Sequence, residues 1–418
     1  MAGPDWYEEG LGHIWLPYTQ MKTTKPPLPV ASADGVQLKL ADGRTLIDGI
    51  SSWWAAAHGY GHPLIVNAMK AQIDAAPHVM FGGLVNEPAL KLATRLAAML
   101  PGDLNRCFIA ESGSVSVEVA MKMAAQYFLN KGEKRSKFVY FRGGYHGDTL
   151  ATMAVCDPDE GMHGHFDGLL ARNMLADLPR TEEEASAFKA FLCKNASEVA
   201  AVVTEPLVQG AGGMVMHGPE TLKWLRQACD EAGVLLIIDE IFTGFYRTGT
   251  RFAIDQAGIV PDMVTLSKAL SGGVGPLSVC VAREEVFSAF YDDDPMKALM
   301  HGPTYMGHAL GCAAANASLD LFEQEDYSAK VAEISAQLEA ELASCRGYDN
   351  VKDVRIMGAI GVVQLKDASA IETLKPLFVE KGVWIRPFRD IVYLAPPLVI
   401  SSKDLSVLTS AIREVLES

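Results

Sequence analysis

The sequence has no uninterrupted apolar run long enough to span a membrane, and its first ten residues, MAGPDWYEEG, lack the basic and apolar regions of a secretory signal. Basic charge is also scarce: 36 Lys and Arg against 51 Asp and Glu give a formal net charge of −15. This excess, with no basic stripe, disfavours binding to nucleic acid or to an anionic membrane. These absences predict a soluble, cytoplasmic protein.

The cysteine pattern predicts neither disulfide bonds nor a metal site. The seven cysteines are odd in number and form no CxxC pair, which argues against a disulfide framework and a thiolate zinc site. The HGH triplet at residues 163–165 lacks acids or cysteines at ligand spacing, so we expect a loop and no metal site. The sequence has neither GxxxxGK[ST] nor a GxGxxG placed between a strand and a helix, which removes two common nucleotide-binding motifs.

Helix-like and strand-like runs do alternate between about residues 85 and 300. The helical runs are Thr94–Leu100 and Val115–Leu129, and the strand-like runs are Ser136–Phe141, Ala200–Pro206, Val234–Glu240 and Asp262–Lys268. The strand-like runs are almost continuously apolar, as is typical of a parallel sheet covered by helices on both faces. We therefore predict an α/β fold.

The two ends of the chain differ from this central part. The C-terminal part has an amphipathic run over Ser328–Cys345, strands around VRIMGAIGVVQL and VYLAPP, and a final helix with a capping pattern at Ser401 and Asp404. The N-terminal part is rich in loops and has a hairpin turn at Asp42 and Gly43. We predict an N-terminal segment, 1–60, that packs with the small domain, a large domain, 61–310, and a small α+β domain, 311–418.

Polar side chains follow several of the predicted strands. Asp239, Lys268 and Glu205 each end a strand-like run, and Tyr145 and Asp148 come shortly after another. Ligands of open parallel sheets bind outside the carboxyl ends of the strands. A buried aspartate or lysine needs a partner or an altered charge state. Pyridoxal 5′-phosphate would satisfy both, because it presents a cationic ring nitrogen to Asp239 and an aldehyde to Lys268.

The phosphate of such a cofactor needs its own binding site. Ser112, Gly113 and Ser114 stand directly before a long helical run. Free backbone N–H groups and the positive end of the helix could hold an anion there. We therefore predict that this turn binds the phosphate.

Five motifs together resemble the class III, fold type I, pyridoxal-phosphate-dependent aminotransferases, through essentially the whole chain: ESGSVSVEVAMK, FRGGYHGDT, IIDEIFTGFYRTG, TLSKALSGG and HGPTYMGHALGCAAANASL. The resemblance implies a large domain with a mostly parallel sheet and a smaller α+β domain built from both chain ends. It also implies that Lys268 forms the Schiff base and carries the proton, and that Asp239 pairs with the pyridine nitrogen. Gly113 and Ser114 would bind the phosphate, and Tyr145 would stack on the ring.

The same resemblance implies a homodimer. Gly302, Pro303 and Thr304 match a segment that, in this class, reaches the phosphate in the partner subunit's site. A monomer would then have an incomplete site.

Within the class, further motifs resemble the aminotransferases of biotin synthesis: HIWLPYTQM, DGISSWWAAAHGYGHP, HVMFGGL, CDPDEGMH and WIRPF followed by VYLAPP. Those enzymes convert 8-amino-7-oxononanoate to 7,8-diaminononanoate, commonly with S-adenosylmethionine as amino donor. The resemblance implies that Arg386 holds the substrate carboxylate. Aromatic walls and one cation suit a long aliphatic acid. The residues implied to bind substrate are Tyr18, Trp53, Trp54, Gly302, Arg386 and Tyr393.

Two alternatives remain open: a general ω-amine transaminase that uses a diamine or β-alanine with pyruvate, and a non-catalytic module that binds pyridoxal phosphate. Tyr246 stands where the class usually has glycine, and GGVGPLSVC also departs from the biotin-synthesis pattern. The sequence leaves the donor open between S-adenosylmethionine and an amine such as lysine.

Overall fold

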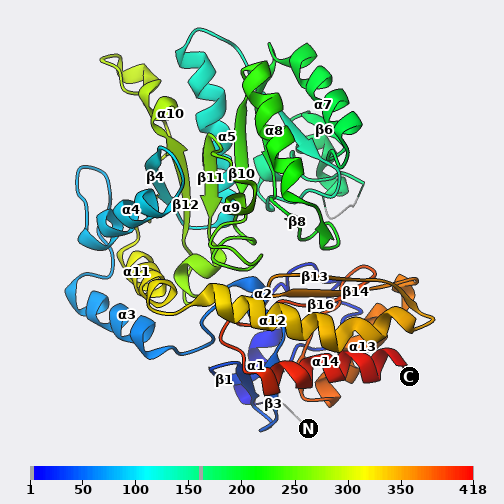
Figure 1. The fold of residues 1–418 in the computed structure, drawn as a ribbon. Helices are drawn as coiled ribbons and strands as arrows, with labels where there is room; N and C mark the ends of the chain where they lie inside the picture. Colours follow the sequence, from blue (N-terminus) through cyan, green and yellow to red (C-terminus); the bar gives the residue numbers. More distant parts are fainter. Residues whose placement is uncertain (1–3, 160–162, 418) are drawn as a thin grey trace.

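The computed structural model describes residues 4–159 and 163–417, which excludes residues 160–162 of the CDPDEGMH motif and the first three residues. A seven-stranded sheet in the order β4-β12-β11-β10-β7-β5-β6 forms its centre (Figure 1). β12 is antiparallel to both of its neighbours, and the other strands run parallel to one another. The strands are β4 (Leu104–Ala110), β5 (Lys137–Phe141), β6 (Met174–Ala176), β7 (Val199–Thr204), β10 (Leu235–Asp239), β11 (Met263–Leu266) and β12 (Ser278–Arg283). The predicted α/β fold is confirmed.

Both faces of this sheet are buried. Along β10, Leu236 and Ile238 belong to one apolar cluster, whereas Leu235 and Ile237 belong to another. α5 (Gly113–Asn130) packs on the second face, while α4 (Glu87–Met99), α7 (Glu182–Asn195) and α8 (Pro219–Ala232) contribute to the first (Figure 1). Successive strand residues point to opposite faces, so a strand covered on both sides must be apolar throughout.

One helix is longer than predicted. α4 begins at Glu87, seven residues before the predicted start at Thr94, because the side chain of Asn86 accepts a hydrogen bond from the backbone N–H of Ala89 at 3.0 Å. Pro88 occupies the first turn, where its missing N–H is not needed. This Asn cap was the available sequence signal.

The C-terminal residues form a second layer of structure. β13 (Val351–Met357), β14 (Ile360–Leu365) and β16 (Ile391–Leu394) make a three-stranded antiparallel sheet, with α12 (Tyr327–Leu342), α13 (Ile371–Glu380) and α14 (Ser402–Glu417) beside it (Figure 1). Ser401 Oγ accepts a hydrogen bond from the backbone N–H of Asp404 at 3.1 Å, which confirms the predicted cap of α14.

The N-terminal residues join this part of the molecule. β1 (Val30–Asp34), β2 (Gln37–Leu40) and β3 (Thr45–Asp48) are antiparallel, and β15 (Val383–Trp384) adds to β3 in parallel. The predicted Asp-Gly turn lies between β2 and β3, with Gly43 at a φ of 91°. α11 (Ala309–Gln324) packs on α3 (Pro63–Ala75) and α4 and contains the predicted boundary at residue 310. The division into three parts stays a proposal.

The remaining elements are short. They are α1 (Asp5–Leu11), α2 (Ser51–Trp54), α6 (Leu150–Met153), β8 (Val208–Gln209), β9 (Val215–Met216), α9 (Ile254–Ala257), α10 (Glu284–Ser288), and the 3-10 turns η1 (Gly164–Leu169), η2 (Lys268–Ser271), η3 (Pro295–Lys297), η4 (Ala343–Gly347) and η5 (Ala368–Ala370). Among the described residues, no helix combines the length and apolar character needed to cross a membrane.

Candidate active site

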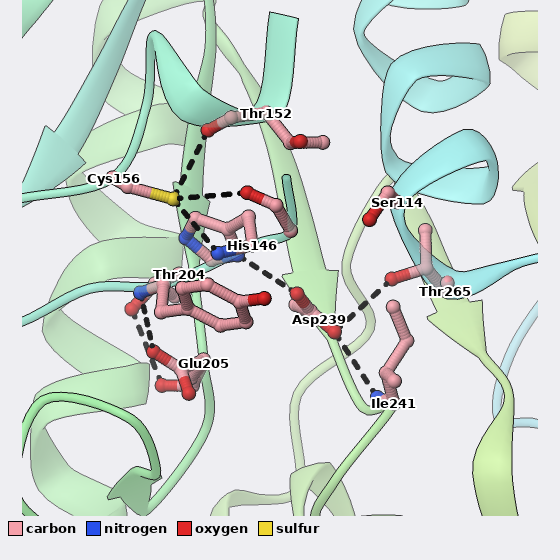
Figure 2. Close-up of polar contacts among 12 residues, drawn as sticks. Ser114, His146, Thr152, Cys156, Thr204, Glu205, Asp239, Ile241 and Thr265 are labelled. Carbon is pink, nitrogen blue, oxygen red and sulfur yellow. Dashed lines mark hydrogen bonds and ion pairs between the residues drawn. The ribbon is translucent and has the colours of Figure 1, made fainter. Parts of the chain in front are cut away.

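The predicted polar groups do meet at the carboxyl edge of the large sheet. Asp239 is the last residue of β10 and lies in register with Thr265 of β11, while Ile238 is in register with Thr204 of β7. Glu205 follows Thr204 directly, so both carboxylates reach the same rim (Figure 2). The parallel register therefore gathers residues that are far apart in the chain.

Asp239 is held by three donors. Its Oδ2 lies 2.8 Å from Nδ1 of His146, and its Oδ1 accepts from the backbone N–H of Ile241 at 3.1 Å and from Oγ1 of Thr265 at 3.4 Å (Figure 2). Asp239 and His146 are both buried. Burial lowers the pKa of His146, but the hydrogen bond and charge of Asp239 outweigh burial and raise it overall. The carboxylate is thus fixed in orientation at the strand end.

Two groups that support this arrangement were not assigned roles from the sequence. His146 follows Tyr145 directly in FRGGYHGDT, and its backbone N–H donates to Sγ of Cys156 at 3.2 Å. Glu205 accepts from the backbone N–H groups of Tyr145 at 3.0 Å and Gly210 at 2.9 Å. Burial raises the pKa of Glu205 to about 7. The available signal was that both residues lie beside predicted strand ends.

Lys268 begins η2, two residues after β11 ends, with a φ of 47°. Its Nζ lies 4.4 Å from the centroid of the Trp54 ring and forms no hydrogen bond or ion pair with the part of the chain that the structure describes. Burial lowers the pKa of Lys268 to about 8, against the charges of Asp239 and Glu205. The neutral form, which is the nucleophile, is therefore far more populated near neutral pH than in an exposed lysine.

Glycine after this lysine has a steric reason. Gly273 has a φ of 81°, and a Cβ there would come within 2.9 Å of Cα of Ala56. The loop after Lys268 can therefore approach the backbone that carries Trp54 only because residue 273 is glycine.

The predicted phosphate turn is packed against the rim. Ser112 caps α5 by accepting from the backbone N–H of Val115 at 3.4 Å. A Cβ on Gly147 would lie 2.0 Å from Oγ of Ser114, and that hydroxyl accepts from the backbone N–H of Asp148 at 3.3 Å. The start of α5 thus stands close to the loop after β5.

These residues fit pyridoxal phosphate. Lys268 supplies an amine without a polar partner among the described residues and with a lowered pKa, Asp239 a fixed carboxylate, and Gly113 the first N–H groups of an 18-residue helix. The three groups match the aldehyde, the ring nitrogen and the phosphate of that cofactor.

Tyr18 and Tyr145 share one acceptor near the rim. Their hydroxyl groups lie 3.1 Å apart, and both donate to the carboxylate of Asp148, with Tyr145 at 3.1 Å. Burial, strengthened by Asp148, raises the pKa of Tyr18 to about 12, and burial also raises the pKa of Tyr145. Both phenols therefore stay protonated near neutral pH. The side chain of Asp148 also accepts from Nε2 of His163 at 2.9 Å.

The predicted substrate residues are linked to Lys268 through Trp54, whose ring contacts its Nζ. The guanidinium carbon of Arg386 lies 4.4 Å from the centroid of the Trp53 ring, and the rings of Trp54 and Tyr393 meet edge to face at 6.2 Å. Arg386 forms no ion pair with any described residue. Burial lowers the pKa of Arg386, yet a guanidinium stays charged at neutral pH. Tyr18 contacts Trp53 at 6.5 Å between ring centroids, so the four aromatic residues form two ring pairs on the consecutive tryptophans.

One predicted group lies apart. Gly302, Pro303 and Thr304 occupy a stretch between η3 and α11 in which Gly302 and Thr304 are exposed. Among the described residues, no hydrogen bond or ion pair joins them to Lys268 or Asp239.

Tyr246 lies in the apolar core. Its ring packs against Phe322 at 5.7 Å and Tyr327 at 5.8 Å between centroids. The next residue, Arg247, is also buried and donates from Nη1 to the carbonyl oxygens of Ala359 at 3.2 Å and Pro396 at 2.8 Å. Burial lowers the pKa of Arg247 to about 10. These two residues connect the loop after β10 to the C-terminal part of the chain.

An open, mostly parallel sheet that presents an aspartate, a buried lysine with a lowered pKa and a helix N-terminus at one rim defines a fold type I enzyme dependent on pyridoxal phosphate. The family model described as aminotransferase class-III matches residues 18–416. The chain belongs to this family, so it is a pyridoxal-phosphate-dependent class III aminotransferase.

Relatives narrow the comparison. The chain is 43% identical over 413 residues to the adenosylmethionine-8-amino-7-oxononanoate aminotransferase of Mycobacterium leprae, which covers 96% of this chain and 94% of that protein. A crystal structure of the Methanocaldococcus jannaschii enzyme of the same name has 33% identity and a TM-score of 0.94, covering 98% of each chain. A cofactor-bound amine transaminase from an uncultivated Pseudomonas species has 30% identity and a TM-score of 0.89, covering 97% of this chain and 98% of its own.

Proposed function

We propose that the chain transfers an amino group to 8-amino-7-oxononanoate, in biotin synthesis, with S-adenosylmethionine as the donor. The observation that carries this proposal is the pair of cations stacked on adjacent indoles: Lys268 on Trp54 and Arg386 on Trp53, each at 4.4 Å. A keto acid with an aliphatic chain could place its ketone at Lys268 and its carboxylate at Arg386. The 43% identity to an aminotransferase of that substrate supports the assignment.

In this proposal each residue has a distinct task. Bound pyridoxal phosphate supplies the electron sink for the carbon that loses a proton, and it carries the amino group between substrates. Lys268 Nζ, whose pKa is lowered to about 8 by burial, would take that proton in its neutral form and return it. Asp239 would pair with the ring nitrogen of the bound cofactor and favour its protonated form. Arg386 binds the keto acid carboxylate through paired hydrogen bonds.

A titration of half-reactions tests the donor. The pyridoxal form is mixed separately with S-adenosylmethionine, lysine and β-alanine, and loss of the absorbance band of the bound cofactor is followed. We expect conversion by S-adenosylmethionine only. Conversion by lysine and not by S-adenosylmethionine would change the donor and keep the acceptor, whereas conversion by β-alanine alone would overturn the biotin-synthesis assignment.

The second candidate is a general ω-amine transaminase. It is favoured by the 30% identity to the amine transaminase from an uncultivated Pseudomonas species. The two candidates differ in the acceptor, since the second uses pyruvate. Turnover of the aminated cofactor form by pyruvate and not by 8-amino-7-oxononanoate would select it.

We also infer a homodimer. Residues 78–85 and 300–305 lie side by side, as the ring contact of His78 with Tyr305 at 4.7 Å shows. Large apolar side chains are exposed on these two segments: Met80, Leu84, Val85, Met300 and Tyr305. An apolar patch beside Thr304 suits a second copy of the chain, which would receive that residue at its phosphate.

Sedimentation together with subunit mixing tests the dimer. Lys268→Ala and Thr304→Asp each impair a different contribution to a shared site, so mixing two inactive variants should restore part of the activity in heterodimers. A monomeric mass, or no restoration despite exchange of subunits, would contradict the shared site.

A further inference from the structure

The two tryptophans of the site, Trp53 and Trp54, lie on a turn with left-handed backbone conformation. Ser51, Ser52, Trp53 and Trp54 have φ values of 50°, 47°, 58° and 74°. Ser52 and Trp53 have ψ values of 57° and 49°, which places both in the left-handed helical region. The backbone N–H of Trp54 donates to the carbonyl of Ile50 at 2.8 Å, so the turn is closed by a hydrogen bond. Side chains other than glycine disfavour this conformation, so the surrounding structure must enforce it.

A single carboxylate enforces it. Asp48 Oδ1 accepts from the backbone N–H of Ile50 at 2.8 Å, and Oδ2 accepts from the backbone N–H of Ser52 at 3.0 Å. The hydroxyl of Tyr60 also donates to Oδ2 at 2.5 Å and lies 2.5 Å from Oγ of Ser52. Asp48 is fully buried. Its two oxygens thus clamp the N–H groups on either side of Ser51.

The same residue is tied to the segment that carries Arg386. Asp48 ends β3 and lies in register with Trp384 of β15, two residues before Arg386. The backbone N–H of Gly49 donates to the carbonyl of Trp384 at 3.0 Å. The clamp and the guanidinium are therefore parts of one small sheet.

The turn presents its indoles to the two cations of the site. Trp53 lies under the guanidinium of Arg386, and the next residue, Trp54, lies under Nζ of Lys268. Adjacent residues of an extended strand would point to opposite faces of a sheet. The left-handed turn is what lets neighbouring side chains lie under two different basic groups.

We infer that Asp48 is a positioning residue for substrate choice: its carboxylate holds the turn at 51–54 and thereby fixes Trp53 against Arg386 while Trp54 lies against Lys268. Loss of the clamp lets the turn relax toward a right-handed or extended backbone, so the carboxylate end of the site loses its stacked arginine first. The inference deepens the proposed function, on which it rests for the identity of the keto acid.

The test compares 8-amino-7-oxononanoate with its methyl ester, which lacks the negative charge and carries one additional methyl group. The ratio of their kcat/KM values reports the carboxylate end of the site and is insensitive to the fraction of active enzyme. In Asp48→Asn an amide N–H₂ replaces one acceptor oxygen and faces donors. We expect the acid-to-ester ratio to fall by about tenfold or more, the effect of losing one charge-assisted contact.

Asp262→Asn is the matched control. Asp262 is also buried and accepts from the backbone N–H of Leu236 at 2.7 Å and from Arg226 at 2.8 Å, at the opposite edge of the large sheet. We expect Asp262→Asn to lower the melting temperature and to leave the acid-to-ester ratio unchanged. An unchanged ratio in Asp48→Asn would overturn the inference.

Near-ultraviolet circular dichroism of the apoprotein gives a readout without turnover. Asp48→Asn should alter the tryptophan bands, and Tyr60→Phe, which removes only one donor, should alter them less. Adding Ser52→Gly to Asp48→Asn should return the bands toward wild type, because glycine adopts positive φ without a clamp. Bands identical to wild type in Tyr60→Phe and Asp48→Asn would also overturn the inference. If 8-amino-7-oxononanoate is not the substrate, the wild-type enzyme will fail to turn it over. The circular dichroism spectra would still test the role of Asp48.

Discussion

The two ends of the active site are built in different ways. At the cofactor end, Asp239 ends β10, Thr265 lies in β11 and Glu205 follows β7, and of these residues and Lys268 only Lys268 has a positive φ. At the substrate end, the wall comes from a left-handed turn and from segments more than three hundred residues apart in the chain, joined by β3 and β15. The sheet positions Asp239, Thr265 and Glu205 without left-handed backbone, whereas the turn that carries Trp53 and Trp54 must be enforced.

The energetic difference is substantial. Left-handed helical backbone costs an L-residue roughly 1–2 kcal/mol, and the turn at 51–54 contains two such residues, Ser52 and Trp53, flanked by two more with positive φ. A domain is stable by only about 5–15 kcal/mol, so the clamp of Asp48 is a large local compensation. The cofactor end is thus rigid because of the fold, while the substrate end is rigid because of a few hydrogen bonds. Variants at the two ends should therefore fail differently.

The largest effect is expected at the cofactor end. Lys268→Ala removes the amine that anchors the cofactor and moves the proton, so both half-reactions should slow by about 10²–10⁴-fold or more. The absorbance band of the covalently bound cofactor should be lost as well. Lys223→Ala, at an exposed lysine paired with Glu220 on α8, is the control and should behave as wild type. Retention of the band or of turnover in Lys268→Ala would refute this role.

A smaller and more selective effect is expected at the substrate end. Arg386→Gln should raise KM for the keto acid by about 10–100-fold, the loss of one charge-assisted interaction. The half-reaction with a simple amine that lacks a carboxylate should keep its rate, because Lys268 and Asp239 are untouched. Arg346→Gln, at an exposed arginine paired with Glu339, is the matched control. An equal loss of rate in the half-reaction with the simple amine would contradict a separate role for Arg386 at the substrate end.

The pH dependence of cofactor binding isolates Lys268 from the substrate end. Only the neutral amine attacks an aldehyde, and burial lowers the pKa of Lys268 to about 8. The rate at which the apoprotein binds pyridoxal phosphate should therefore rise with pH up to about 8 and then level off. Stopped-flow absorbance measures this rate. A rise that continues to pH 10 would mean that burial does not depress the pKa.

The lowered pKa of Lys268 also makes the stability of the apoprotein depend on pH. The folded pKa of about 8 lies below the ordinary value of 10.5, so between these values the unfolded chain binds more protons than the folded apoprotein. The contribution of Lys268 to the free energy of unfolding therefore rises with pH across this window and is lowest below pH 8. In Lys268→Met, the stability of the apoprotein should no longer show this rise.

Sequence reasoning succeeds where the fold itself places the residues. Asp239 and Lys268 could be found because buried strands are apolar, so a charged residue at the strand end is conspicuous. His146 escaped because its role depends on a contact with Asp239, 93 positions away. The clamp of Asp48 escaped because DGISSWW contains no glycine at the left-handed positions, and sequence rules expect glycine there. The roles of Trp53 and Arg386 came from resemblance alone and stay predictions.

The smallest effect on activity is expected for Tyr246→Phe, because Tyr246 belongs to neither end of the site. Its hydroxyl accepts only a long hydrogen bond, at 3.3 Å, from Nε of Arg251, and its ring packs against Phe322 and Tyr327 in the core. Tyr246→Phe keeps the ring, so the free energy of unfolding should fall by no more than about 1 kcal/mol. The rates of both half-reactions should be unchanged.

Tyr246→Gly introduces the residue that is usual in the class. It relieves the φ of 69° but removes a buried ring, so the free energy of unfolding, measured by chemical denaturation, should fall by about 2–4 kcal/mol. A change in acceptor preference in Tyr246→Phe, without a change in stability, would instead place this residue at the substrate end.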